Sequence, residues 1–255
     1  MTGFPSLADH LLVLLFGCGL PLLSSLQGRR ALDSIVFTEP VRRRFYLSNS
    51  LTLALFAGII LVSWSIQDRP FAEMGFRAPK PSPDMGLATG LTLLLMAAYT
   101  LDLLQGVRKA HRHREERTRM LERTPFLPRH ARELPLYVLM CASAGVFEEI
   151  IYRGFMVTYF LPEPNGRSGW PWLAVTVPAL LFGMAHHYQG WQAMGKVMLL
   201  SMLLALIFIL SGSIGWVMAV HFGIDLAAGI ATMGVIRKAD GDGPVLMHTD
   251  TAGED

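Results

Sequence analysis

The chain has 255 residues, of which 52% are hydrophobic and only 16% are charged. Soluble domains carry about 25% charged residues, and the mean hydropathy of this chain is +0.39. The formal net charge of +2 is too small to indicate nucleic-acid binding. Composition therefore argues against a soluble domain and against a nucleic-acid partner, and it predicts a polytopic protein embedded in a lipid bilayer.

A helix needs about 20 apolar residues to cross about 30 Å of hydrocarbon, and several stretches approach this length. We therefore expect an all-α fold, a polytopic transmembrane helical bundle of about seven spans. In chain order the expected spans are residues 8–26, 47–66, 85–104, 134–161, 171–188, 194–210 and 214–236.

Lys and Arg are concentrated in two of the connections between spans. The first basic group lies at residues 29–44 and the second at residues 108–132, whereas no Lys or Arg precedes Arg29. Because basic loops stay on the cytoplasmic side, this bias predicts an N-terminus outside and a C-terminus inside the cell. The segment 108–132 is interpreted first as a topology signal, with a surface helix that touches anionic lipid as the alternative.

The sequence divides into three parts with different expected roles. Residues 1–133 form the N-terminal transmembrane helices and a basic cytoplasmic loop. Residues 134–236 form the core that carries the chemistry, because the ionisable residues inside spans fall almost entirely there. Residues 237–255, which begin with a glycine- and aspartate-rich stretch, are expected to be a disordered cytoplasmic tail.

The fourth expected span contains the run Val-Phe-Glu-Glu-Ile-Ile-Tyr-Arg-Gly at residues 146–154. A charged side chain at the bilayer centre costs about 2.5–3.5 kcal/mol on insertion scales, so such residues usually have a function. Glu149 and Arg153 are four residues apart and share a helical face, which predicts a structural, neutralising pair. Glu148 points about 100° away and lacks a local cation, so we expect it to act as a general base on water. The alternative is a purely structural polar network of all three.

Two later spans add polar side chains to the same membrane region. Phe182 and His186 are four residues apart at the end of the fifth span, and His221 and Asp225 are four apart in the last one. Residues at this spacing share a helical face. A lone histidine at a helix end is more often interfacial than catalytic. His186 is therefore a candidate catalytic residue only because Glu148 and His221 are also present.

The three motifs Glu-Glu-x-x-x-Arg, Phe-x-x-x-His and His-x-x-x-Asp, in this order on successive apolar segments, resemble those of the CPBP family of CAAX-processing and bacteriocin-processing intramembrane proteases. The resemblance covers about residues 134–233. It implies an intramembrane glutamic endopeptidase, a hydrolase that cleaves a membrane-associated or lipidated protein or peptide. The compact chain resembles bacterial members of the family, which implies the bacterial plasma membrane.

The resemblance also implies roles for single residues. Glu148 would activate the attacking water, His186 would orient it, and His221 with residue 225 would stabilise the oxyanion. The family usually has asparagine at this last position, whereas the chain has Asp225, and an ionised aspartate cannot donate a hydrogen bond. Asp225 is therefore either protonated, or it accepts from His221 and holds the imidazole as a cationic donor. We expect the second role.

No cofactor is expected, although Glu148, His186 and His221 could form a three-ligand zinc site. The sequence lacks His-Glu-x-x-His, the usual helical signature of zinc proteases, and the resemblance implies a metal-independent mechanism. Two other functions compete with proteolysis. A proton-coupled transporter also places Glu, His and Arg in the membrane, and a non-catalytic membrane binding or immunity protein could keep the same fold. The substrate and the oligomeric state stay open.

Overall fold

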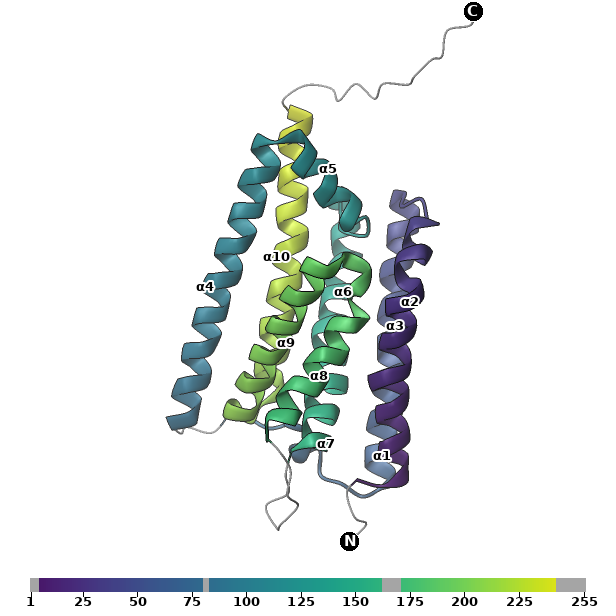
Figure 1. The fold of residues 1–255 in the computed structure, drawn as a ribbon, viewed down its shortest axis with the longest axis vertical. Coiled ribbons are helices and arrows are strands. Elements are labelled where there is room, and N and C mark those ends of the chain that lie inside the picture. The colour runs from purple at the N-terminus through teal and green to yellow at the C-terminus, as the bar shows by residue number, and fades with distance from the viewer. Residues whose placement is uncertain (1–4, 80–82, 162–170, 242–255) are drawn as a thin grey trace, which may run out of the picture.

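The computed structural model describes residues 5–79, 83–161 and 171–241, and all regular structure within these ranges is helical. Six helices in the described ranges are long and apolar enough to cross a membrane, and Pro171–Ala185 is a shorter apolar helix. The expectation of a helical polytopic bundle with about seven spans is confirmed. Figure 1 shows that most helices run along the long axis of the molecule.

The long helices are joined by short connections. The first and fourth spans contain π-helical segments, and these segments and the 3-10 turns are both labelled η. The elements are α1 (Leu7–Leu12), η1 (Val13–Gly19), α2 (Leu20–Asp33), α3 (Glu39–Ile66), η2 (Phe71–Met74), α4 (Pro83–Arg112), α5 (Arg114–Arg123), η3 (Ala131–Glu133), α6 (Leu134–Ser143), η4 (Ala144–Glu148), η5 (Ile150–Val157), α7 (Thr158–Phe160), α8 (Pro171–Ala185), η6 (His187–Gln189), α9 (Trp191–Ser211) and α10 (Ile214–Gly241).

The observed spans follow the expected ones, but several differ at their ends. Helix α2 continues to Asp33, α3 already begins at Glu39 and α4 continues to Arg112, each beyond the expected span. Helix α8 stops at Ala185, because His186 leaves the helical conformation, and Gly190 with φ +97° is the N-cap of α9. Helix α10 continues past residue 236 to Gly241. The rest of the expected tail, residues 242–255, lies outside the described residues.

The two ends of the bundle differ in charge. In Figure 1 the described N-terminal residues lie at one end, and α5 and the last turn of α10 lie at the other. The turn between α8 and α9 stops well short of this second end. The basic connection after α4 is thus at the same end as the last residues of α10, as the charge bias requires if the spans alternate in direction.

The packing around η4 and η5 decides where the polar residues of the core lie. Every residue of η5 is buried, which fits a segment surrounded by protein rather than lipid. A Cβ atom added at Gly145 would lie 3.0 Å from the backbone nitrogen of Phe222 and 3.0 Å from the carbonyl oxygen of Met218. Since only glycine allows this close approach, η4 and α10 nearly touch through their backbones, beside Glu148 on one side and His221 on the other.

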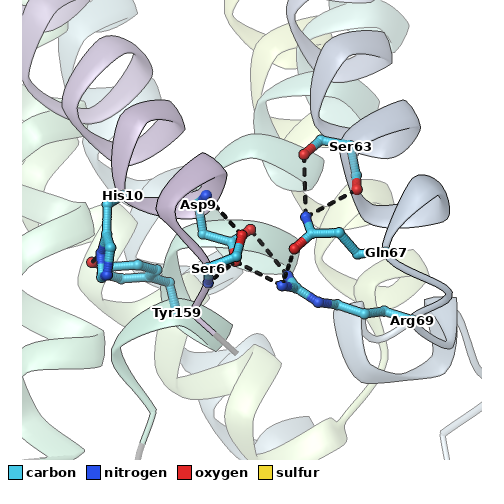
Figure 2. Close-up of polar contacts among 7 residues, drawn as sticks. All are labelled: Ser6, Asp9, His10, Ser63, Gln67, Arg69 and Tyr159. Atoms are coloured by element: carbon cyan, nitrogen blue, oxygen red, sulfur yellow. Dashed lines mark hydrogen bonds and ion pairs between the residues drawn. The ribbon is translucent and has the colours of Figure 1, made fainter. Parts of the chain in front are cut away.

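The first span is attached to the rest of the bundle by a buried ion pair, the Asp9–Arg69 clasp. Arg69 donates from Nη1 to Asp9 Oδ1 at 3.0 Å and from Nη2 to Oδ2 at 2.8 Å. Ser6 donates to the same carboxylate from its backbone nitrogen at 2.6 Å and from its hydroxyl at 2.9 Å. Figure 2 shows this cluster, with Gln67 also bonded to Arg69. Both oxygens of Asp9 are satisfied, so the clasp fixes α1 to the segment after α3.

A second buried pair ties α3 to the start of the fourth span. Arg42 donates from Nε to Glu133 Oε1 at 2.9 Å, and Nη2 of Arg42 reaches the same oxygen at 2.5 Å. The backbone nitrogen of Arg129 donates to Glu133 Oε2 at 2.7 Å. Here too both carboxylate oxygens are satisfied, which is how buried charges are normally accommodated.

Candidate active site

The two adjacent glutamates lie where two π-helical segments meet. Glu148 ends η4, and Glu149 stands between η4 and η5. The sequence predicts a regular α-helix here, so the π-helical turns are a difference that only the structure reveals. Such segments are rare and occur frequently at functional sites, because a widened turn redirects side chains that a regular helix would hold in register.

Glu149 is the centre of a buried polar network. Its Oε1 accepts from Nη1 of Arg153 at 2.7 Å, as the four-residue spacing predicts. The same oxygen lies 2.6 Å from Nδ1 of His221, a residue 72 positions later in the chain. Arg153 also donates to the hydroxyl of Ser201 at 3.0 Å. Within the described residues Glu149 Oε2 has no hydrogen-bond partner, so this buried carboxylate is only half satisfied.

His221 is held between three carboxylates. With Nδ1 bonded to Glu149, its Nε2 points toward the other two, 3.8 Å from Glu148 Oε2 and 3.6 Å from Asp225 Oδ2. Both distances are too long for hydrogen bonds. The residue in hydrogen-bond contact with the imidazole is therefore Glu149. From the sequence we expected Asp225 to make this contact and Glu149 to pair with Arg153.

The three carboxylates differ in their access to solvent. The side chain of Glu149 is fully buried, that of Glu148 is 16% exposed and that of Asp225 is 35% exposed. Glu148 makes no hydrogen bond to another described residue. The open side of the cluster is thus lined by Glu148 and Asp225, and a water molecule entering there would meet Glu148 and Nε2 of His221.

His186 follows α8 and joins the site through an aromatic ring. Its Nδ1 lies 2.8 Å from the carbonyl oxygen of Phe182, and because a carbonyl only accepts, Nδ1 carries the proton and Nε2 keeps its lone pair. The ring of Phe182 lies 4.5 Å from the His186 ring and 6.2 Å from the His221 ring, centroid to centroid. The guanidinium of Arg153 lies 5.2 Å from the same ring. His186 thus faces the cluster, without a direct polar contact to it among the described residues.

Sequence reasoning missed two contacts that fix the site. The hydroxyl of Tyr137 donates to the carbonyl oxygen of Asp225 at 2.7 Å. A Cβ atom at Gly229 would lie 2.1 Å from the Tyr137 ring, so glycine at this position is what lets Tyr137 reach α10. The second missed contact is the Ser201 hydroxyl on Arg153. For the contact of Tyr137 with Asp225, the only signal in the sequence is Gly229, one turn after Asp225. For the contact of Ser201 with Arg153 the sequence contains no signal.

The described residues do not fit a metal centre. They contain no group of three His, Cys, Asp or Glu side chains arranged to hold a metal ion. Both nitrogens of His221 already face carboxylates, and Nδ1 of His186 is bonded to a carbonyl. Zinc therefore has no role in the proposed chemistry, and the absence of a cofactor stays a prediction.

A bundle of membrane-spanning helices with a cluster of carboxylates, imidazoles and a guanidinium at its core defines the class, a polytopic membrane protein with a candidate intramembrane active site. Residues 130–227 match the family model described as type II CAAX prenyl endopeptidase Rce1-like. This confirms the resemblance that the three motifs indicated, and the matched segment contains all of them. Comparisons with curated proteins and with solved structures gave no match.

The match extends from η3 into α10, so it covers the whole polar cluster and leaves the first three spans outside. It supports an intramembrane endopeptidase, a hydrolase integral to the membrane that acts on a peptide or protein substrate.

Proposed function

We propose that the protein is an intramembrane glutamic endopeptidase in which Glu148 activates the water that hydrolyses a peptide bond. The observation that carries this proposal is the position of Glu148, a partly exposed carboxylate that forms no hydrogen bond with any described residue. It lies 3.8 Å from an imidazole that another carboxylate holds in place. The substrate is a membrane-associated or lipidated protein or peptide.

The residues divide the work as follows. Glu148 takes a proton from water as the water oxygen attacks the carbonyl carbon, and it later returns that proton to the leaving amine. The lone pair on Nε2 of His186 accepts a hydrogen bond from the water and fixes its orientation. His221, cationic among three carboxylates, donates from Nε2 to the developing oxyanion.

Glu149 is a positioning residue in this scheme. Its bond to Nδ1 of His221 fixes the ring orientation and keeps Nε2–H directed at the reaction space. Arg153 fixes Glu149 in turn, and Ser201 fixes Arg153. Asp225, which lies 3.6 Å from Nε2 of His221, adds negative charge that favours the cationic imidazole.

The proposal includes the place of the protein in the cell. The basic connections favour a cytoplasmic position for the end of the bundle that carries α5 and the last turn of α10. The membrane would be a bacterial plasma membrane. No metal takes part.

The test is Glu148→Gln, which keeps the shape and removes the base, with His10→Gln at the far end of the first span as a matched substitution outside the cluster. A lipidated reporter peptide is offered to protein in vesicles, and cleavage is followed by mass spectrometry. We expect Glu148→Gln to lower the rate by about 10²–10⁴-fold, the usual contribution of a general base, with the same thermal melting point as the wild type.

Four results would contradict the proposal. A fully active Glu148→Gln protein would exclude this base. Loss of cleavage with a chelator and its return with zinc would establish a metalloprotease instead. A cellular phenotype that survives Glu148→Gln would favour a non-catalytic binding protein, and proton-coupled uptake of a solute would favour a transporter.

A further inference from the structure

The basic segment, defined here as residues 108–123, comprises the last turn of α4 and all of α5. It begins four residues past the apolar stretch 85–104, which is about 6 Å along a helix and comparable to the depth of one headgroup layer. Figure 1 shows α5 at the end of the bundle where α10 also ends. Its cations are Arg108, Lys109, Arg112, Arg114, Arg117, Arg119 and Arg123, and its acids are Glu115, Glu116 and Glu122.

The arginines of α5 are not equivalent. Arg119 forms ion pairs with Glu115 at 3.7 Å and with Glu116 at 3.4 Å on the same helix. Arg114, Arg117 and Arg123 make no ion pair within the part of the chain that the structure describes. No residue of α5 is buried. The helix therefore contains one internally neutralised cation and three cations whose charge is available to a partner.

The position of these three cations favours one kind of partner. A guanidinium matches the geometry of a phosphate group and binds it through two parallel hydrogen bonds. At the depth of α5 the available phosphates belong to lipid headgroups, and anionic lipids attract basic residues that flank a membrane span. A purely electrostatic topology signal would need only the charges, whereas headgroup binding needs charges that are exposed and not already paired.

The segment after α5 connects this surface to the candidate active site. The ring of Phe126 lies 6.3 Å from that of Tyr188, which stacks on His186 at 6.0 Å. The carbonyl oxygen of Phe126 accepts from the hydroxyl of Tyr46 at 2.7 Å, which fixes it against α3. The end of α5 is therefore only three residues before Phe126, whose ring packs against Tyr188, and Tyr188 in turn stacks on His186.

We propose that Arg114, Arg117 and Arg123 bind the phosphate groups of anionic phospholipids in the adjacent leaflet, and that this contact supports Phe126 against the α8–α9 turn. The binding itself is independent of any catalytic activity. The effect on the site rests on the proposed function, because it is measured as a change in peptide cleavage.

Binding is tested with the full-length protein in vesicles of equimolar phosphatidylglycerol and phosphatidylcholine. Spin-labelled phosphatidylglycerol reports its association with the protein, and spin-labelled phosphatidylcholine is the reference lipid. We expect phosphatidylglycerol to be preferred. Each of Arg114→Gln, Arg117→Gln and Arg123→Gln should lower this preference by about fivefold, the usual contribution of one basic side chain near an anionic surface.

Arg119→Gln is the matched control, because it removes the same charge from the same helix but from an arginine already paired with glutamates. It should change the preference less than twofold. An equal loss in all four variants would mean that only the overall charge attracts the lipid, and it would overturn the proposal. Equal binding of both lipids by the wild type would also overturn it.

Two further experiments test whether something other than lipid binds the arginines of α5. Millimolar inorganic phosphate should leave the lipid preference unchanged, and if it abolishes the preference, the site recognises free phosphate. Removal of residues 242–255, which contain several acidic side chains, should also have no effect. If a preference emerges only after this removal, the partner of α5 is the acidic tail and the proposal fails.

The link to the site is read from cleavage in the same vesicles. The triple variant of Arg114, Arg117 and Arg123 should cleave the reporter peptide several-fold more slowly than Arg119→Gln. Unchanged cleavage with reduced lipid binding would contradict the link alone. Absence of cleavage by the wild type in every vesicle would count against the proposed function, and the lipid measurement would still decide the binding.

Discussion

The protein buries two kinds of charged cluster, and they differ in how completely the carboxylates are satisfied. In the Asp9–Arg69 clasp every carboxylate oxygen accepts at least one hydrogen bond. In the central cluster Glu149 Oε2 has no partner within the described residues, and Glu148 only approaches His221 at 3.8 Å. A satisfied carboxylate stabilises the fold, whereas an unsatisfied one keeps lone pairs for water or substrate. Burial of charge by itself therefore does not mark an active site.

The clasp should affect stability and not chemistry. Asp9→Ala leaves the buried guanidinium of Arg69 without its main partner, and breaking a buried pair in this way costs about 3–5 kcal/mol. We expect a lower melting temperature in vesicles, with an unchanged cleavage rate per folded molecule. The double variant Asp9→Leu/Arg69→Met should recover most of the loss. A selective loss of turnover in a fully stable Asp9→Ala protein would remove the distinction between the two clusters.

The replacement Glu149→Gln is conservative in shape, but it should lower the rate of peptide cleavage strongly. Glu149→Gln keeps the volume and can still accept from Arg153, but it removes the negative charge beside Nδ1 of His221. We expect the turnover number to fall by about 10²–10³-fold, as when an oxyanion donor is lost, with little change in the Michaelis constant. Glu149→Asp should recover part of the rate if the carboxylate positions the ring. Equal turnover in wild type and Glu149→Gln would show that the network is only structural.

Asp225→Asn should have a smaller effect, because the closest partner of His221 is Glu149. We expect turnover to fall by roughly tenfold, since one of three carboxylates that favour the cationic imidazole is lost. Stability should change little at this partly exposed side chain. Equal or higher peptidase activity in Asp225→Asn would mean that an amide serves at this position as well as the carboxylate, and that Asp225 does not hold His221.

The smallest expected effect is that of Ser201→Ala. The variant removes one hydrogen bond to Arg153, which keeps its bonds to Glu149 and to the carbonyl oxygen of Ser201. A hydrogen bond to a charged group contributes about 1.5–3 kcal/mol at most, so a shift of the melting temperature by a few degrees is expected. Turnover should fall less than tenfold. A loss as large as that of Glu149→Gln would place Ser201 in the catalytic machinery.

The sequence was sufficient to predict the spans and most of the polar residues of the site. The lengths of the apolar stretches predicted the helices, because hydrocarbon thickness sets how many residues a span needs. The four-residue spacing of Glu149 and Arg153 predicted their ion pair, because this contact lies within one turn of one helix. The ends of the spans were less accurate, since α2, α3 and α4 continue past the apolar stretch into polar residues. Hydropathy measures only the part of a helix that lies in hydrocarbon.

The sequence by itself determined that charged residues lie inside apolar spans, and this follows from local composition. Only the tertiary structure decided that Glu149, and not Asp225, lies within hydrogen-bond distance of His221. That contact joins residues 72 positions apart and depends on the backbone approach of Gly145 to α10 and on the π-helical turns around Glu149. Spacing along one helix says nothing of which neighbouring helix will come close enough to supply a partner. The difference between the saturated Asp9–Arg69 pair and the half-satisfied Glu149 carboxylate therefore follows from packing.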